Sequence, residues 1–260
     1  MSVRVSLTIF RRFAALICLC GVAILVPALT HAVSIWSDLQ EMTRQREGLA
    51  PARAVFDVIR LAQQHRGLSA VALGGDEGKA AARAEKATEI DRALAVFDRL
   101  IETDHARRSP VGRAWAEAQA DWRNLRDEVA QKKLDGPASS ARHGALIQRL
   151  LSTLDLGLGH WGLVYVSDPE DYDLVMVLQE VPRMIEIVGQ MRARGVNLLS
   201  APDRATPMAR AAYGALADQF VGQFGRVQHY LSLLAEAEGA GAADLAAASG
   251  ALRRSGEQAI

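Results

Sequence analysis

Residues 63–70 read Gln63-Gln64-His65-Arg66-Gly67-Leu68-Ser69-Ala70, a polar and cationic patch inside an otherwise apolar helical pattern. Apolar side chains recur around this patch at the three- and four-residue spacing of a buried helical stripe: Val58, Leu61, Leu68 and Ala72. His65 falls on that stripe and Arg66 at its edge. Burying an imidazole or a guanidinium costs several kcal/mol unless a partner is present. Gly67 lacks a side chain, so we expect a neighbouring helix or a small ligand to approach there. The patch therefore predicts a binding position within a helical bundle.

The composition favours helices and gives no sign of a nucleic-acid partner. Half of the 260 residues are hydrophobic but only 5% are aromatic, and the frequent Ala, Leu, Arg, Glu and Gln are good helix formers. The 30 basic and 30 acidic residues cancel, so the chain carries no basic footprint for DNA or RNA. Common catalytic and metal-binding motifs (HExxH, CxxC, GxSxG and the phosphate-binding Gly-Lys-Ser/Thr) do not occur in the sequence. We therefore predict no enzyme, no cofactor and no metal site.

A membrane anchor is predicted near the N-terminus, where the apolar run from Phe13 to about Trp36 contains no charged side chain. Roughly 20 helical residues cross the hydrocarbon core of a bilayer, so residues 13–36 suffice for a transmembrane helix. Three arginines precede it: Arg4, Arg11 and Arg12. By the positive-inside rule, residues 1–12 are then cytoplasmic and residues 37–238 form a periplasmic domain outside the inner membrane. A cleaved signal peptide is the alternative, with Thr30-His31-Ala32 as its cleavage sequence, although the run is longer than a usual signal core.

Turn and capping residues divide the rest of the chain into helices. Pro51 marks a helix start or a kink, and we predict a helix from there to about Leu73, ended by Gly74-Gly75, with Asp76 capping the helix that follows. Ser109-Pro110 separates the next two apolar stripes along the chain.

A turn at residues 135–139 precedes a helix from about Ser140 to Val164, and Asp168-Pro169 begins another helix. Asp accepts hydrogen bonds from the first free amides of a helix, and Pro suits its first position. The predicted apolar stripes are Ile90, Leu94, Phe97 and Ile101; Trp115, Ala118, Trp122, Leu125 and Val129; Leu146, Leu150, Leu154 and Trp161; Leu174, Leu178, Val181, Ile185, Val188, Gly195 and Leu199, with Arg192 among them; and Tyr213, Leu216, Phe220, Val227, Leu231 and Leu234.

No stretch is typical of a strand, so we predict an all-α fold, a transmembrane helix followed by an up-and-down helical bundle. Gly239 to Gly241 marks a break, and residues 239–260 are predicted to form a C-terminal helical segment that leads to a second transmembrane helix. No second run of about 20 apolar residues precedes Ile260. We therefore expect the chain to be truncated or incomplete, without the returning helix and the signalling region.

Two segments carry a family resemblance: QQHRGLSAVALGGD at residues 63–76 and SDPEDYDLVMVLQEVPRMIEIVGQMRARG at residues 167–195. They resemble the periplasmic sensor region of bacterial methyl-accepting chemotaxis proteins, with similar input domains on histidine kinases and diguanylate cyclases. The chain departs from the family pattern at Asp173, where a second tyrosine is usual.

The resemblance also implies a ligand. Related nitrate- and nitrite-sensing helical domains hold a small anion with one arginine from each of two helices, which by similarity indicates Arg66 and Arg192, with Arg194 behind them. His65 and His160, together with Trp161, are candidates to line the same site. Two guanidiniums in a dry interior repel unless an anion or carboxylates neutralise them. The alternative is therefore a purely structural network in which these arginines pair with buried acids, for example Asp168 or Glu180.

Two functions of different classes follow. The chain is either the sensory input region of a membrane receptor, which binds a small, anionic ligand and passes a helix displacement across the bilayer, or a ligand-free, membrane-anchored interaction bundle. For the receptor we expect a homodimer in the inner membrane, resembling a chemoreceptor, with a histidine kinase or a diguanylate cyclase as the alternative output. Cytoplasmic signalling partners are expected only where an output module is present.

Overall fold

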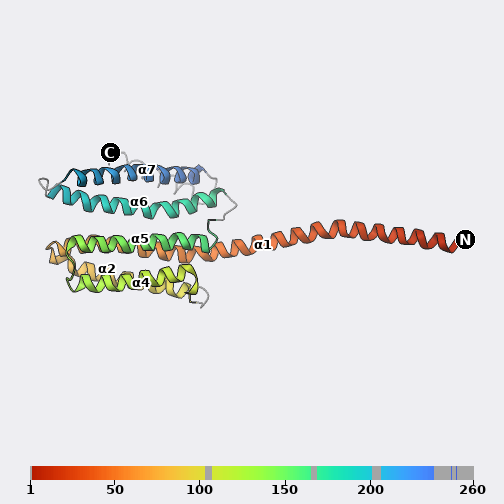
Figure 1. Ribbon diagram of the computed structural model, residues 1–260, viewed down its shortest axis with the longest axis horizontal. Coiled ribbons are helices and arrows are strands. Elements are labelled where there is room, and N and C mark those ends of the chain that lie inside the picture. The colour runs from red at the N-terminus through yellow and green to blue at the C-terminus, as the bar shows by residue number, and fades with distance from the viewer. Residues whose placement is uncertain are drawn as a thin grey trace. The chain divides into compact units, whose positions relative to one another are not determined.

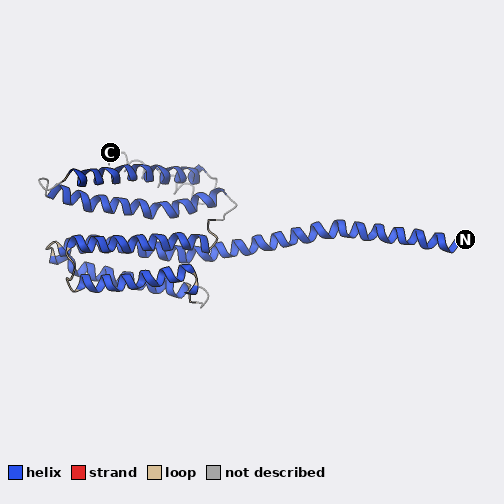
Figure 2. Ribbon diagram, viewed as in Figure 1, coloured by secondary structure: helices blue, strands red, loops and turns tan. Residues whose placement is uncertain are grey.

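The structure, a computed structural model, describes residues 2–102, 107–164, 169–200 and 206–236, together with residues 247 and 250. Its main elements are α1 (Ser2–Leu73), the short 3-10 helix η1 (Glu77–Lys79), α2 (Ala80–Leu100), α4 (Pro110–Ala130), α5 (Gly136–His160), α6 (Pro169–Ser200) and α7 (Pro207–Glu236). The described residues contain no strand (Figure 2). The all-α prediction is therefore confirmed.

The chain divides into two compact units, residues Met1–Arg46 and Glu47–Ile260. The first unit is the N-terminal part of α1. Within the described residues, α1 is the one helix long and apolar enough to cross a membrane, with a mean hydropathy of 2.5 in an 18-residue window that is 0% buried. By length and composition this segment fits the predicted single-pass anchor.

The second unit is built around a four-helix core. From residue 47 onward, α1 packs with α2, α4 and α5 around one continuous apolar cluster, and α6 and α7 lie on the far side of α1 and α5 from α2 and α4 (Figure 1). The stripes predicted for α2, α4 and α5 are all buried in this cluster. Two indole N–H groups on α4 bond to carboxylates on α2, Trp115 to Asp98 at 2.9 Å and Trp122 to Asp91 at 2.7 Å. The large tryptophans thus fill the core and satisfy their polar atoms at its edge.

The predicted helix ends are mostly confirmed. Gly75 adopts a left-handed backbone with φ of 115° just after α1, and Asp76 accepts a hydrogen bond from the amide of Gly78 at 3.1 Å, so it caps η1 as expected. Ser109 likewise accepts from the amide of Gly112 at 3.1 Å and begins α4.

Two predicted helices have wrong boundaries, and the second also ends earlier than expected, at His160 rather than near Val164. Pro51 does not begin a helix, because α1 continues through it from Ser2 to Leu73; a single proline removes only one backbone donor from the helix. Residues 135–139 are not a separate turn, and the helix begins at Gly136 rather than near Ser140. Asp135 accepts from the amide of Ala138 at 2.7 Å, so the residues that look like a turn are a helix cap and first turn.

The stripe predicted for α6 is also wrong. Leu174, Ile185 and Val188 are exposed, as is Arg192 from the same stripe. The side chains of α6 that are buried include Val175, in the main core, and Met184, which packs with Val227 and Leu231 of α7 in a second apolar cluster. Because α6 has apolar residues around most of its circumference, three-four spacing alone does not select the face that is buried.

Some predictions fall on residues outside the described part of the chain. Asp168 as a helix cap, the break at Gly239 to Gly241, and the helical segment 239–260, apart from residues 247 and 250, are among them. Pro169 is the first residue of α6, as expected for a proline at a helix start.

Candidate functional site

The polar patch of α1 buries His65, Arg66 and Ser69 in the second unit, at the junction of α1 with α5 and α6. His65 is 2% exposed and Arg66 is 6% exposed. Consecutive residues of an α-helix point about 100° apart, so these neighbours face different helices: His65 contacts α5 and Arg66 contacts α6. The prediction that both side chains are buried and need partners is confirmed.

The partner of Arg66 is Glu186 of α6. The Nη1 atom of Arg66 lies 2.7 Å from Oε1 of Glu186, and the Glu186 side chain is only 2% exposed. Two amides add to this contact: Gln190 donates to Oε1 at 2.9 Å, and Gln63 donates to Oε2 at 3.3 Å. A buried ion pair with additional hydrogen bonds offsets the cost of removing both charges from water, whereas either charge alone is strongly destabilising.

A glycine on α6 makes room for the guanidinium. A Cβ atom built on Gly189 would lie far inside van der Waals contact of the Nη2 atom of Arg66. The role expected of Gly67 is not found, because that residue is exposed and a Cβ there would meet nothing within 4 Å. The space for the guanidinium is left by a glycine of the opposite helix, one turn after Glu186.

The partner of His65 is a second buried histidine, His143 of α5. Nδ1 of His143 lies 2.7 Å from the backbone oxygen of Ser139, to which it donates, leaving its Nε2 as an acceptor. Nδ1 of His65 lies 2.8 Å from that Nε2 and therefore donates to it. The rings of His65 and Trp122 pack nearly perpendicular to each other, with centroids 5.0 Å apart. The hydrogen bonds thus require His143 to be neutral and His65 to carry a proton on Nδ1.

The electrostatics of the site agree with this assignment. Burial, reinforced by the neighbouring His143 and Arg83, lowers the pKa of His65 to about 3. Burial also lowers the pKa of His143 to about 4, although its bond to the Ser139 carbonyl opposes the shift and Arg66 adds to it. At neutral pH the pair adds no positive charge beside Arg66.

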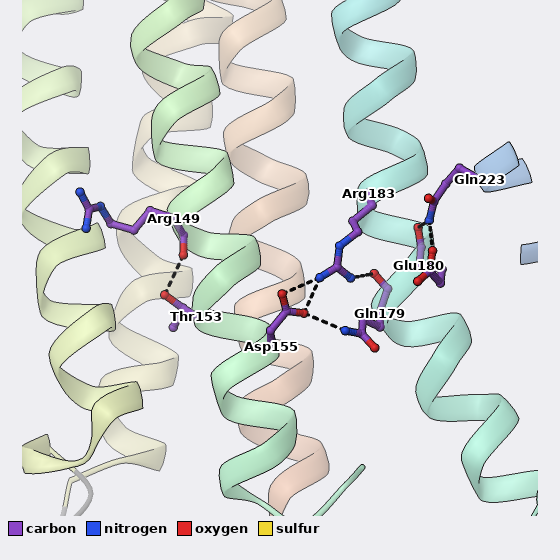
Figure 3. A network of polar contacts seen from close by, with 7 residues as sticks. All are labelled: Arg149, Thr153, Asp155, Gln179, Glu180, Arg183 and Gln223. Atoms are coloured by element: carbon purple, nitrogen blue, oxygen red, sulfur yellow. Dashed lines mark hydrogen bonds and ion pairs between the residues drawn. The ribbon is translucent and has the colours of Figure 1, made fainter. Parts of the chain in front are cut away.

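A second polar contact joins α6 to α5. Figure 3 shows Asp155 of α5 facing Arg183 and Gln179 of α6. Arg183 donates to both carboxylate oxygens, at 2.6 and 2.5 Å, and the Gln179 amide donates at 3.2 Å. This contact fixes α6 against α5 one turn before Glu186, independently of Arg66.

Of the two acids proposed as alternative partners of the arginines, Glu180 does not fill that role. Glu180 contacts Gln223 and Arg226 of α7, on the opposite side of α6 (Figure 3), and Asp168 is outside the described residues. For Arg66, the expectation that a buried acid pairs with the arginine nevertheless agrees with the structure, since a buried carboxylate does neutralise it. That carboxylate belongs to Glu186.

The other predicted site residues are not brought to Arg66. Arg192 is exposed, and Arg194, also exposed, lies 3.5 Å from the backbone oxygen of Ala212 on α7. His160 is exposed at the end of α5, about 25 Å along that helix from His143 at 1.5 Å per residue. Trp161 packs against Gly48 and Gly157 at that same end. Expecting His160 and Trp161 to line one site with His65 was wrong, because helical rise separates them.

Sequence reasoning missed Glu186 and His143. His143 precedes Leu146 and Leu150 at three- and four-residue spacing, so the signal that identified His65 was present there too. Glu186 gave a weaker signal, because it lies outside the three-four stripe that was assigned to α6.

The family assignment follows from comparison with known sequences. A family model described as nitrate and nitrite sensing matches residues 57–258. The match covers most of the chain, including both buried histidines and the Arg66–Glu186 pair. The chain therefore belongs to the nitrate and nitrite sensing family of periplasmic sensor domains, which serve as input domains of signalling receptors. No curated protein sequence and no solved structure gives a significant match.

The glycine that admits Arg66 can be tested by a matched pair of substitutions. Gly189→Ala should lower the free energy of unfolding by about 2 kcal/mol, because the new methyl group drives Arg66 from its buried carboxylate. Gly67→Ala should raise it by up to about 1 kcal/mol, since alanine is the better helix former where space is free. Urea unfolding of the detergent-solubilised chain measures both, and equal effects of the two substitutions would contradict the packing described.

The histidine pair predicts that stability rises with pH between about 4 and 7. In that window the unfolded chain binds protons at both histidines, with ordinary pKa values near 6.5, while the folded chain does not. Lowering the pH from 7 to 5 should therefore cost on the order of 2 kcal/mol per histidine. His143→Gln should flatten the profile by about that amount, measured by unfolding at each pH. His229→Gln, at an exposed site, is the control and should leave the slope unchanged; an unaltered slope in His143→Gln would disprove the neutral pair.

Proposed function

We propose that the chain is the anion-binding input region of a bacterial membrane receptor, with nitrate or nitrite bound at Arg66 between α1 and α6. The observation that supports this most is the buried guanidinium, which faces the junction of two helices in a domain of this family. A guanidinium presents paired donors that match the oxygens of a planar anion. Burial strengthens such a contact, because water does not compete for it.

The remaining arginines of α6 have a weaker role in this proposal. Arg192 lies six residues beyond Glu186, about 9 Å along the helix and roughly 120° around it. Its exposed guanidinium draws an anion toward the site by long-range attraction, with Arg194 behind it. His65 holds α1 against α5 and so positions Arg66. His160 is not included, since it lies at the other end of α5.

The receptor context completes the proposal. The apolar segment of α1 is an uncleaved anchor in the inner membrane, and the second unit lies in the periplasm. Binding at α1 changes a helix that also contains the anchor, which is a direct route for a displacement across the bilayer. The output resembles that of a chemoreceptor, with a histidine kinase or a diguanylate cyclase as the alternative. A structural bundle whose Arg66–Glu186 pair never opens is the competing function.

We further propose that two copies pack through the exposed stripe of α6. Leu174, Ile185 and Val188 are 40%, 37% and 37% exposed. With the half-buried Leu178 and Val181, of which Val181 also packs against the α6–α7 cluster, they follow the alternating four-three spacing of a coiled-coil seam. A self-complementary apolar stripe of this kind suits a two-fold dimer.

Ligand binding can be tested by thermal unfolding of the full chain in detergent. Nitrate or nitrite at 100 times its dissociation constant should stabilise the fold by about 2.7 kcal/mol. Arg66→Ala should abolish the shift, and Arg192→Ala should weaken binding only a few-fold. Arg183→Ala is the matched control: it removes another α6 ion pair and should lower stability yet keep the shift. No shift with either anion would rule out the proposed function, and a normal shift in Arg66→Ala would rule out the site.

The dimer can be tested by analytical ultracentrifugation of the detergent-solubilised chain. Ile185→Lys or Val188→Lys should convert the dimer to a monomer, because a buried lysine in an apolar seam is costly. Val221→Lys, at a 53% exposed position on α7, is the control and should leave the mass unchanged. A wild-type chain that sediments as a monomer, or a dimer that survives both α6 substitutions, would exclude this interface.

A further inference from the structure

The carboxylate of Glu186 is held by donors from both helices. Arg66 and Gln63 approach it from α1, at 2.7 and 3.3 Å, and Gln190 approaches it from its own helix at 2.9 Å. All three donors converge on one buried group. Gly189 lies beside the guanidinium and keeps the adjacent surface of α6 free of a side chain.

This donor set suits more than a glutamate side chain. A carboxylate is a planar group that spreads one negative charge over two oxygens, and nitrite and nitrate are planar anions that spread one negative charge over two and three oxygens. Donors arranged for the first therefore serve the others as well. Because His65 and His143 are neutral in the folded chain, a single negative charge neutralises Arg66, which favours a monoanion.

We propose that Glu186 is an internal counter-anion: its carboxylate occupies the anion position in the ligand-free protein, and the incoming anion displaces it from Gln63, Arg66 and Gln190. The inference rests on the proposed function. It adds which side chains donate to the bound anion and that the Glu186 carboxylate competes with it. One negative charge replaces another beside Arg66, so the guanidinium is never left buried and unpaired.

The exchange gives the ligand a mechanical consequence. Within the described residues, Arg66–Glu186 is the one ion pair between α1 and α6, whereas Arg183–Asp155 joins α6 to α5. Displacing Glu186 breaks this ion pair between α6 and α1. The Arg183–Asp155 pair between α6 and α5 stays in place. The ligand therefore breaks the contact between α1 and α6 only in the fraction of molecules in which it displaces Glu186 from Arg66.

Competition also sets the apparent affinity. A site whose binding-competent state is fractionally populated has its affinity reduced by that fraction. Where Glu186 occupies Arg66 for nine-tenths of the time or more, removing it should tighten anion binding about tenfold or more.

Chemical rescue tests this directly. Glu186→Ala removes the carboxylate and leaves its position open to formate, nitrite or nitrate, each added to the full chain in detergent and compared with chloride at equal ionic strength. We expect each anion to raise the melting temperature of Glu186→Ala at concentrations about tenfold or more below those that affect the wild type. Asp155→Ala is the matched control, because it removes another carboxylate that holds α6 without touching Arg66, and it should respond like the wild type. If Glu186→Ala does not fold, isothermal titration of the isosteric Glu186→Gln should show the same gain.

The outcomes separate the two proposals. A response of Glu186→Ala to formate alone supports the displaced carboxylate and overturns nitrate and nitrite as ligands. A wild type that binds nitrate or nitrite, beside a Glu186 variant that binds no better, overturns the competition and leaves the proposed function standing. An equal gain in Asp155→Ala overturns the competition too, since loosening α6 is then sufficient. No response in any chain overturns both.

Discussion

A buried positive charge beside a helix–helix junction constrains the rest of this domain. Arg66 lies in the interior, so a negative group must be supplied from outside α1, and Glu186 supplies it from α6. That requirement places Glu186 of α6 beside Arg66 of α1. Gly189 leaves the space that the guanidinium occupies. Removing either charge leaves the other uncompensated at low dielectric, which makes this contact far more sensitive to chemistry than an apolar one.

The second unit combines an apolar core with a helix hairpin that is attached to it partly through ion pairs. The core of α1, α2, α4 and α5 is one apolar cluster with interleaved tryptophans, whereas α6 meets it largely through the polar side chains around Glu186 and Asp155. Apolar packing is non-directional and hard to reverse with a small ligand, but an ion pair can be exchanged by another ion. On the proposed function, the exchangeable contact lies between the apolar bundle and the helix hairpin α6–α7.

Much of the fold followed from local chemistry. Gly74-Gly75, Asp76 and Ser109 end and begin helices as their capping preferences require, and the stripes of α2, α4 and α5 are buried as their spacing indicates. Local reasoning failed where several outcomes satisfy the same pattern. Asp135 to Ser139 resembles both a turn and a capped helix start, and α6 is apolar on more than one face, so the wrong stripe placed Arg192 in the interior.

The sequence alone determined that His65 and Arg66 are buried on a helix and need partners, because periodicity and desolvation are local properties of the chain. It also determined the helical class and the family to which the domain belongs. Only the tertiary structure decided which side chains contact Arg66 and His65. Pairing Arg66 with Glu186, and His65 with His143, joins residues far apart in the chain, and the choice among several acids and histidines depends on how the helices are rotated and aligned. That rotation is set by the whole core, and no single segment encodes it.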